Sequence, residues 1–354
     1  MTTRREFLSH AGIAFVGCAL APLAGAQAPR RREVVVSARR VKTIDIHAHC
    51  VVPEAQALMK QKPPGDYAMT WQERLRQMDA QGIDMEALSI NPTWYALERD
   101  LAAQVIQLQN EKLAELCTRY PDRLVAFASV ALQYPDLAAQ ELEHAVKKLG
   151  LRGAAIGGSV EGVELSDAKF HPFWAKAEEL GVLVFMHPQR TGDLQNRLKG
   201  NGYLENTIHN PLETTIALSH LIYEGTLDRF PGLKLCAAHG GGYLPSYADR
   251  SDAVCHLRPG TCDKVTLKKK PTEYLRQLYY DSLVFSPEAL RHLAAQVGAS
   301  QIMLGTDTPF HWTTTAVDHV LSTPELSEGD RAAILGETAA KLLAINGVRS
   351  TLQK

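Results

Sequence analysis

The stretch "KTIDIHAHC", residues 42–50, joins a short apolar segment to two histidines separated by one alanine. Its two isoleucines alternate with an aspartate, which is typical of a β-strand. Side chains at positions i and i+2 of a strand point to the same face, about 7 Å apart along the chain. We therefore expect His47 and His49 to converge just beyond the strand end. Two imidazoles placed in this way can bind a metal ion.

A short apolar strand followed by an amphipathic helix recurs along the chain. Eight candidate strands lie at residues 43–47, 85–90, 123–130, 152–157, 182–187, 233–239, 278–285 and 301–307. Helices are predicted at residues 71–81, 97–120, 136–149, 171–180, 212–229, 287–297 and 327–345. This alternation indicates parallel strands joined by helical crossovers, and the near-continuous apolar strands indicate burial on both faces.

Eight such units favour an α/β fold of the (β/α)8 TIM-barrel type. A doubly wound open sheet is the alternative. No GxGxxG motif follows the first strand, which removes the usual reason to choose a dinucleotide-binding sheet.

In a (β/α)8 barrel the chemistry gathers at the C-terminal ends of the strands. Four predicted strands end there in a histidine or an aspartate, namely His47 and His49, His187, His239, and Asp307. Each residue alone has a structural explanation, since a histidine at a strand end is commonly just hydrogen-bonded and Asp307 could cap a turn. Together they predict a divalent-metal site, because packing gives no reason to place such groups at the same end of four strands.

The overall composition is that of a globular protein. The chain has 354 residues, of which 22% are charged and 45% hydrophobic, and this length fits one large domain or two average ones. A net charge of -1, with no basic run interleaved with aromatic residues, argues against a nucleic-acid-binding protein.

The N-terminal residues 1–28 have the three parts of an export signal. Paired arginines at positions 4 and 5 resemble a twin-arginine signal, and an apolar run at 11–23 precedes small residues. This run is too short to cross about 30 Å of hydrocarbon as a helix, so we expect a bacterial periplasmic or exported protein without stable membrane insertion. Cys18 in the run could be a lipoprotein cysteine, but its surroundings match that signal poorly. We expect residues 29–40 to be a loose basic lead-in and 41–350 a single barrel.

Five cysteines remain after removal of residues 1–28, and no CxxC motif occurs among them. The odd number argues against a disulfide framework, and the spacing against a zinc knuckle. Most are expected to be small core residues, although Cys255 and Cys262 could pair in an oxidising periplasm.

The motifs "IDIHAH", "HP", "HGGG" and "LGTDTPF", in this order, resemble the amidohydrolase superfamily. They are most similar to its branch of 2-amino-3-carboxymuconate-6-semialdehyde decarboxylase and related non-oxidative decarboxylases, in amidohydrolase-related family 2. The similarity spans residues 43–346 and includes "RLRQMDAQGID" (74–84), "NPLETTIA" (210–217), "FPGLKLCAAHGGG" (230–242) and "GETAAKLL" (336–343).

This resemblance implies that His47, His49, His187 and Asp307 bind one divalent metal ion, with zinc expected and manganese as the alternative. Asp307 is then also a catalytic residue, and His239 stays off the metal as the general acid/base that activates a metal-bound water. We expect the glycines at 240–242 to leave room for substrate beside His239.

The resemblance also places two arginines at the substrate. Arg74 falls in the matching "RLRQMD" motif, and Arg250 lies eleven residues after the HGGG histidine, where the family uses an arginine from a neighbouring subunit. Both hold substrate carboxylate in the family, which implies a small carboxylic acid substrate and a homodimer. The family decarboxylase has a tryptophan directly after the His-Pro pair of the fifth strand, where this chain has Gln189 followed by Arg190. The pocket is therefore expected to be more polar, and the substrate to differ.

The predicted function is therefore a metal-dependent non-oxidative decarboxylase, a carbon-carbon lyase acting on an aromatic or muconate-type acid. The alternatives are a metal-dependent hydrolase of a lactone, ester or amide, or a hydratase, with the same site. A third alternative is a periplasmic binding protein on a catalytically inactive barrel. Substrate specificity is expected in the loops 52–70, 188–209 and 308–325, because loops carry most binding residues.

Overall fold

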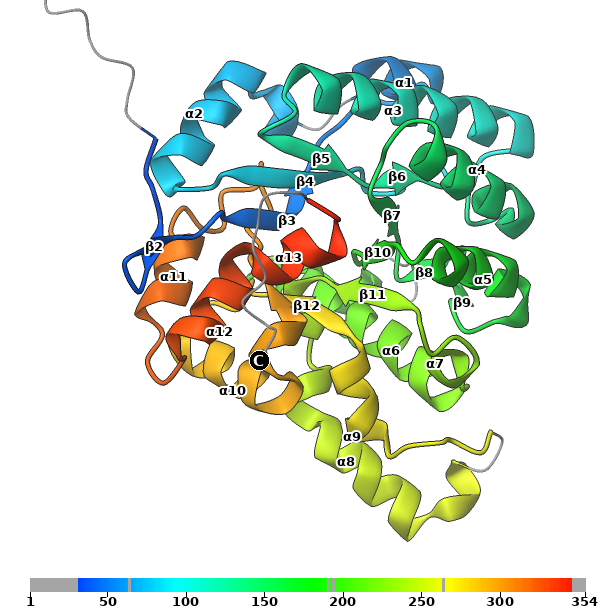
Figure 1. The fold of residues 1–354 in the computed structure, drawn as a ribbon. Helices are drawn as coiled ribbons and strands as arrows, with labels where there is room; N and C mark the ends of the chain where they lie inside the picture. The colour runs from blue at the N-terminus through cyan, green and yellow to red at the C-terminus, as the bar shows by residue number, and fades with distance from the viewer. Residues whose placement is uncertain (1–30, 63–64, 190–191, 193–194, 263–264, 346–354) are drawn as a thin grey trace, which may run out of the picture. The chain divides into compact units, whose positions relative to one another are not determined.

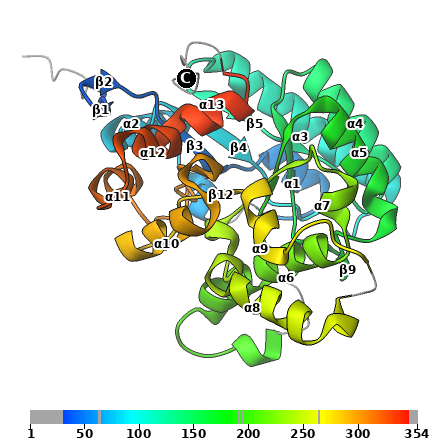
Figure 2. The ribbon, with the colours of Figure 1, turned by 60° about the horizontal axis from the view of Figure 1, so that its bottom comes forward.

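The computed structural model describes residues 31–345, except 63–64, 190–191, 193–194 and 263–264. The predicted export signal therefore lies outside the described residues. Figure 1 shows the strands at the centre of the described chain, and Figure 2, turned by 60°, shows helices around them.

The barrel strands follow one another in chain order, and all of their pairings are parallel. One part of the sheet contains β3 (Ile44–His49), β4 (Met85–Ser89) and β5 (Leu124–Ala126). The other part contains β6 (Ala128–Ser129), β7 (Gly153–Ile156), β10 (Leu183–Met186), β11 (Lys234–Ala237), β12 (Tyr279–Asp281) and β13 (Ile302–Met303). β5 and β6 are one strand interrupted at Phe127, whose N–H still donates to the Leu88 carbonyl at 2.9 Å. All eight predicted strands are thus present.

Hydrogen bonds between the first and last strands close the sheet into a barrel. The N–H of Ile46 donates to the Leu304 carbonyl at 2.8 Å, and the N–H of Asp307 donates to the His47 carbonyl at 2.8 Å. The predicted (β/α)8 barrel is confirmed, and the open-sheet alternative is excluded because an open sheet leaves its edge strands unpaired.

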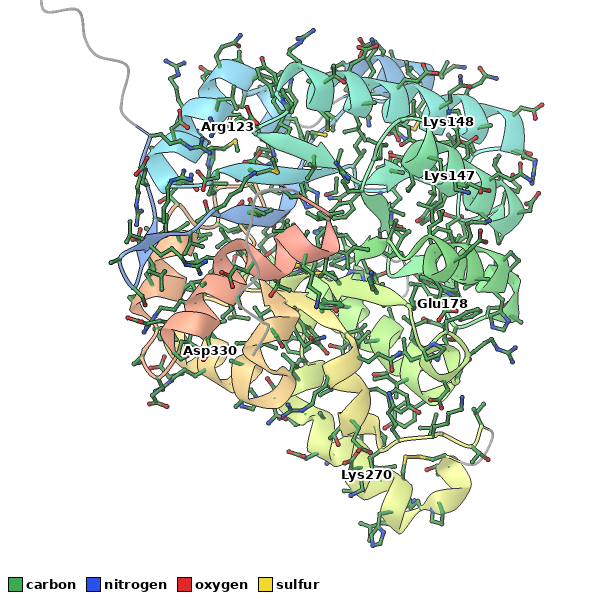
Figure 3. All side chains as sticks on the ribbon, in the orientation of Figure 1. Arg123, Lys147, Lys148, Glu178, Lys270 and Asp330 are labelled. Carbon is green, nitrogen blue, oxygen red and sulfur yellow. A yellow bond between two sulfur atoms is a disulfide. The ribbon has the colours of Figure 1, made fainter. Side chains whose placement is uncertain are left out.

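Five helices begin and end within two residues of their predicted bounds. They are α2 (Trp71–Gln81), α3 (Arg99–Arg119), α4 (Pro135–Lys147), α5 (His171–Leu180) and α10 (Pro287–Val297). A capping box between Thr70 and Glu73 begins α2, and Gly82 in the left-handed conformation ends it. Lys147 and Lys148, which are labelled in Figure 3, are exposed at the end of α4.

Two predicted helices are divided. The 212–229 segment forms α6 (Asn210–Tyr223) and α7 (Thr226–Arg229), because Gly225 lies between them with φ +75°. The 327–345 segment forms α12 (Glu328–Ala332), a π-helical turn (Ala333–Glu337) and α13 (Thr338–Leu342).

Four helices and a small hairpin were not predicted. The helices are α1 (Pro53–Leu58), α8 (Leu244–Leu257), α9 (Pro271–Tyr274) and α11 (Ala316–Ser322), and the hairpin consists of β8 (Ser159–Val160) and β9 (Val163–Glu164). Three of the helices are short. The longest, α8, buries only Leu244, Pro245 and Ala248 near its start, so it lacks a continuous apolar stripe.

Residues 31–40 differ from the expected loose lead-in. They contain an antiparallel pair, β1 (Val35–Val36) with β2 (Arg39–Arg40). Val36 is buried, and Arg40 donates to the buried carboxylate of Asp84 at 2.8 Å. The expectation was wrong here because Val34 and Val36 bury apolar surface and the arginines of β2 bind carboxylate partners.

The barrel interior is filled by apolar side chains below the polar residues. Phe127 and Phe185 stack there with ring centroids 5.8 Å apart, in a cluster that includes Ile44, Ile46 and Met303. A second, larger apolar cluster fills the layer between strands and helices. At the N-terminal end, the π-helical turn before α13 packs its backbone against the start of β3 (Figure 1).

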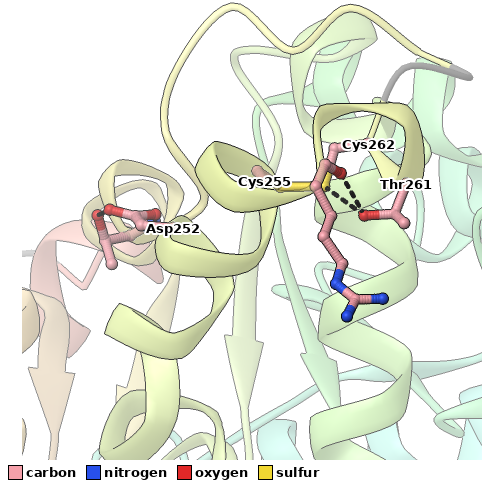
Figure 4. Close-up of a disulfide and its surroundings, with 6 residues drawn as sticks. Asp252, Cys255, Thr261 and Cys262 are labelled. Atoms are coloured by element: carbon pink, nitrogen blue, oxygen red, sulfur yellow. Dashed lines mark hydrogen bonds between the residues drawn. A yellow bond between two sulfur atoms is a disulfide. The ribbon is translucent and has the colours of Figure 1, made fainter.

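α8 and α9 extend away from the barrel in Figure 1. A disulfide between Cys255 and Cys262 closes the end of α8 (Figure 4), with a Cα–Cα distance of 5.5 Å, so the pairing considered from the sequence is present. The described free cysteines are Cys50, Cys117 and Cys236. Within the described residues, none of the helices has the length and apolar character needed to span a membrane.

We predict that Gly242→Ala destabilises the fold by at least about 3 kcal/mol, as measured by chemical denaturation. Gly242 has φ +66°, and an added Cβ would collide with the carbonyl oxygen of Pro211. Gly150→Ala is the matched control, because Gly150 has φ +72° but an added Cβ meets nothing within 4 Å. It should lose only about 1–2 kcal/mol. Equal losses in the two variants would contradict the close packing inferred at Gly242.

Candidate metal centre and cavity

Three histidines and one aspartate meet at the C-terminal end of the barrel. One ligand atom from each of His47, His49, His187 and Asp307 lies within 4.8 Å of the other three, and all four residues are buried. His47 and His49 lie at the end of β3, His187 follows β10 and Asp307 follows β13, so all four are at the strand ends that the sequence predicted. Their convergence is therefore a direct consequence of barrel closure.

A register shift in β3 directs two histidines into the site. The pairing of β3 with β4 is regular at Asp45 and again at Ala48, and it is irregular between them. Ile46 belongs to the interior cluster that contains Phe185, and the ring of His47, the next residue, lies 5.1 Å from the Phe185 ring. Such irregularities commonly redirect side chains next to active sites.

The Nδ1 atoms of His47 and His49 both have hydrogen-bond partners within the protein. Nδ1 of His47 lies 2.6 Å from the carboxylate of Asp281, and Nδ1 of His49 lies 2.8 Å from the hydroxyl of Ser89. Their Nε2 atoms lie 3.0 Å apart, at 3.1 Å and 3.0 Å from Oδ1 of Asp307. These contacts turn the Nε2 atoms toward the centre of the cluster, as in histidines that bind metals.

Asp281 was not among the predicted site residues. Its signal was its place as the only charged residue in the predicted strand 278–285, near the C-terminal end where site residues gather.

The pKa values in the cluster follow from burial and mutual charge. Burial lowers the pKa of His49 to about 4. It also lowers the pKa of His187 well below its usual value, and the neighbouring imidazoles lower that pKa further. Burial opposes ionisation of Asp307, but interactions with His47 and His239 hold its pKa well below the usual range. Burial likewise lowers the pKa of His47, yet the carboxylates of Asp307 and Asp281 outweigh it and raise the pKa to about 10. The surroundings therefore favour neutral imidazoles at His49 and His187, an ionised Asp307 and a positively charged His47, whose Nε2 proton a bound cation would displace.

The donor set fits a divalent cation. Nδ1 of His187 is buried without a hydrogen-bond partner, and Oδ1 of Asp307 makes no well-aligned hydrogen bond although two histidine nitrogens lie close to it. Buried polar atoms are normally paired, so these atoms point to a ligand that the protein itself does not supply. Three imidazoles and one carboxylate are a set that zinc and manganese both accept.

His239 lies beside the four candidate ligands but outside their group. Its Nε2 is 3.8 Å from Oδ2 of Asp307, and its ring centroid is 5.1 Å from that of His47 and 5.2 Å from that of His187. Its backbone has φ +56°, and Asp307 has φ +63°, a conformation that side-chain-bearing residues adopt at a cost and mainly at functional sites.

The glycines after His239 serve the protein fold and not substrate access. An added Cβ at Gly240 would lie 2.7 Å from the side chain of Val284, and one at Gly241 would lie 2.6 Å from the ring of Tyr280. Both have positive φ angles. The expectation that they make room for substrate is therefore wrong, because neighbouring side chains already fill that space.

A cavity of about 610 Å³ opens onto the cluster and is lined by His187 and Asp307. All three loops that were expected to set specificity contribute to its wall. Aromatic rings of Tyr67 and Phe310 pack edge to face at 5.7 Å, while those of Tyr203 and Trp312 stack at 6.2 Å. Further lining comes from amide side chains, namely Gln56, Gln61, Asn91, Gln189, Asn206 and Asn210. The wall is both aromatic and polar.

The two predicted substrate-binding arginines do not line this cavity. Arg74 is buried, where its Nε donates to Glu86 and another nitrogen donates to the His49 carbonyl, each at 2.6 Å. It lines a neighbouring hollow of about 190 Å³, and one of its terminal nitrogens is buried without a partner. Arg250 is exposed on α8, at a groove that also contains Tyr247.

Comparisons with known proteins agree with this geometry. 2-Amino-3-carboxymuconate-6-semialdehyde decarboxylase of Dictyostelium discoideum is 31% identical over 278 residues, which cover 77% of this chain and 76% of the relative. Gamma-resorcylate decarboxylase of Rhizobium radiobacter is 31% identical over 333 residues, which cover 86% of this chain and 98% of the relative.

A solved structure of a dihydroxybenzoic acid decarboxylase from Polaromonas sp., with bound manganese and the inhibitor 2-nitroresorcinol, superposes with a TM-score of 0.76. It is 26% identical to this chain, and the match covers 87% of this chain and 98% of the other. The Amidohydrolase family model matches residues 44–345. The predicted resemblance is confirmed, and the chain belongs to the Amidohydrolase family.

Proposed function

We propose that the protein is a metal-dependent non-oxidative decarboxylase of an aromatic carboxylic acid, and hence a carbon-carbon lyase. The observation that carries this proposal is the buried group of three imidazoles and one carboxylate, with His239 beside it, next to an aromatic-walled cavity that His187 and Asp307 line. Relatives that match most of this chain are decarboxylases, which supports the same reaction class.

The residues divide into holding and proton-transfer roles. His47, His49, His187 and Asp307 would hold the divalent cation, which when bound would supply Lewis-acid polarisation of a substrate oxygen. The aromatic side chains of the cavity would orient the substrate ring by stacking, and its amides would bind polar ring substituents.

His239 would move the proton. In the net reaction the bond between ring and carboxylate breaks, CO2 leaves, and the ring carbon takes one proton in its place. His239 is positioned for this transfer because it reaches the edge of the cluster, and the Asp307 carboxylate 3.8 Å away helps to orient its ring. Asp307 therefore takes part both in holding the cation and in directing the acid/base.

The first test is product analysis. We expect the purified metal-loaded protein to release one CO2 and one decarboxylated product per molecule of substrate, on a panel of mono- and dihydroxybenzoates with muconate semialdehydes included. Labelled CO2 trapping and chromatography would measure both products. Consumption of a lactone, ester or amide without CO2 would instead support the hydrolase alternative.

The second test separates the proposed roles. His239→Ala should keep its metal while turnover falls by about 10²–10⁴-fold, the usual effect of losing a positioned acid/base. His49→Ala should lose metal and activity together. Metal content and steady-state kinetics measured on the same samples test these two roles. Equal loss of metal in both variants would contradict the assignment of His49 to metal binding and of His239 to proton transfer. Reconstitution with Zn²⁺ and Mn²⁺ in parallel would test zinc as the proposed native ion.

We also propose a homodimer in which Arg250 contributes to the partner's substrate site and Arg74 contributes within its own chain. The exposed part of α8 supports the dimer, because Tyr247 is 71% exposed in the groove that contains Arg250, and Leu257 at the end of the helix is 75% exposed. Sedimentation should give twice the monomer mass. Arg250→Ala should then raise KM without loss of metal, and a monomeric active enzyme would contradict this arrangement.

Export by the twin-arginine route remains our proposal for residues 1–28. The disulfide between Cys255 and Cys262 supports it, because disulfides persist mainly in oxidising compartments. Cell fractionation of the full chain, compared with a variant in which Arg4 and Arg5 are both replaced by lysine, would test it. Equal recovery of both from the cytoplasm would contradict export.

A further inference from the structure

The buried carboxylate of Asp281 joins two parts of the site that come from different strands. It ends β12 and has no solvent exposure. Its Oδ2 accepts from Nδ1 of His47 at 2.6 Å and from the N–H of His239 at 2.9 Å. Its Oδ1 accepts from the N–H groups of Gly240 at 2.8 Å and Leu283 at 3.1 Å. One side chain thus contacts both a candidate metal ligand and the backbone of the proposed acid/base.

The contact with His47 sets the tautomer of that ring. An ionised carboxylate only accepts hydrogen bonds, so Nδ1 of His47 must carry a proton. A neutral imidazole with a proton on Nδ1 presents its lone pair at Nε2, the atom that faces Asp307 and His49. Asp281 therefore keeps His47 in the form that can bind a cation.

The contacts with the backbone hold the turn that carries His239. His239 and Gly240 both have left-handed φ angles, +56° and +62°, so their successive N–H groups point toward a common acceptor. The two oxygens of Asp281 accept one N–H each. This satisfies two buried donors in a conformation that the histidine backbone would otherwise disfavour.

We propose that Asp281 is a positioning residue that fixes the tautomer of His47 and, at the same time, the turn that presents His239. This inference rests on the metal site of the proposed function. It does not depend on which reaction that site performs.

Asp281→Asn tests it with little change in shape. Whichever way the amide lies, its NH2 group faces two N–H donors that previously had an acceptor. We expect the Kd of the metal-depleted full chain for Zn²⁺ to rise about 10–100-fold, as for other residues that support metal-bound histidines. Competition with a chromophoric chelator, without substrate, measures this Kd.

A spectroscopic readout separates tautomer control from general loosening. In long-range ¹⁵N–¹H spectra at saturating Zn²⁺, wild-type His47 should show its proton on Nδ1, and Asp281→Asn should lose or shift that signal. The control is Asp84→Asn, because Asp84 is also a buried carboxylate but accepts from the N–H of Thr43 at 2.9 Å, toward the other end of β3. It should lower the unfolding midpoint and leave the Zn²⁺ affinity unchanged.

Wild-type Zn²⁺ affinity in Asp281→Asn, or an equal loss in Asp84→Asn, would overturn the proposal. If Asp281→Asn does not fold, Asp281→Glu keeps the charge but displaces it by one methylene. It should weaken Zn²⁺ binding by at least about threefold, a smaller loss of the same kind, and unchanged affinity would again overturn the proposal. These Zn²⁺ measurements contain no substrate, so their interpretation would hold even if the protein proved not to be a decarboxylase.

Discussion

The hydrogen bonds between β3 and the segment around β13 are the constraint on which the site depends. They join His47 to Asp307, which are 260 positions apart in sequence, through a backbone contact of 2.8 Å. A parallel barrel places all strand ends on one rim, and closure then makes the first and eighth strands neighbours. Without closure, the two β3 histidines and the aspartate after β13 would lie at opposite edges of a sheet. The metal ligands are thus assembled by the same bonds that complete the fold.

Closure also concentrates charge that must be balanced. Asp45, Asp281 and Asp307 are all buried near His47, and isolated buried carboxylates are costly. Their surroundings shift the pKa values of these carboxyl groups in different directions. Burial and the nearby Glu86 raise the pKa of Asp45 to about 7. Burial also opposes ionisation of Asp281, but its interactions with His47, His239 and the backbone together outweigh burial and lower its pKa. Asp307 keeps an oxygen without a well-aligned hydrogen bond. A bound cation would satisfy that oxygen and offset the buried negative charge.

Much of this arrangement was predictable because it follows from strong periodic signals. Apolar runs predicted all eight strands, although β12 and β13 are shorter than predicted, and clear end signals predicted five helices nearly at their observed bounds. Polar residues at strand ends identified all four candidate ligands. The β3 register shift was not predictable, because it depends on pairing with β4 and not on the sequence of β3 alone. α8 was missed because its exposed length carries no regular apolar stripe.

Residues whose roles depend on their partners were the hardest to predict. Asp281 occurs inside an apolar strand with no motif around it, and its importance follows only from its contacts with His47 and His239. Arg74 was predicted to bind substrate, and its ion pair with Glu86 and its hydrogen bond to the His49 carbonyl depend on the folded chain. The glycines after His239 were assigned to substrate access, whereas the structure shows that they accommodate neighbouring side chains. The spacing of residues in the sequence predicts that they lie at the C-terminal end of the barrel, but not which groups each side chain contacts.

The central claim is that four side chains from three strands bind one cation at the open end of the barrel. Anomalous X-ray scattering from crystals of the purified chain, recorded at the zinc and manganese edges, tests it most directly. We predict one strong peak bounded by His47, His49, His187 and Asp307. A fully ordered cluster without a peak, in crystals grown with either metal in excess, would contradict the account.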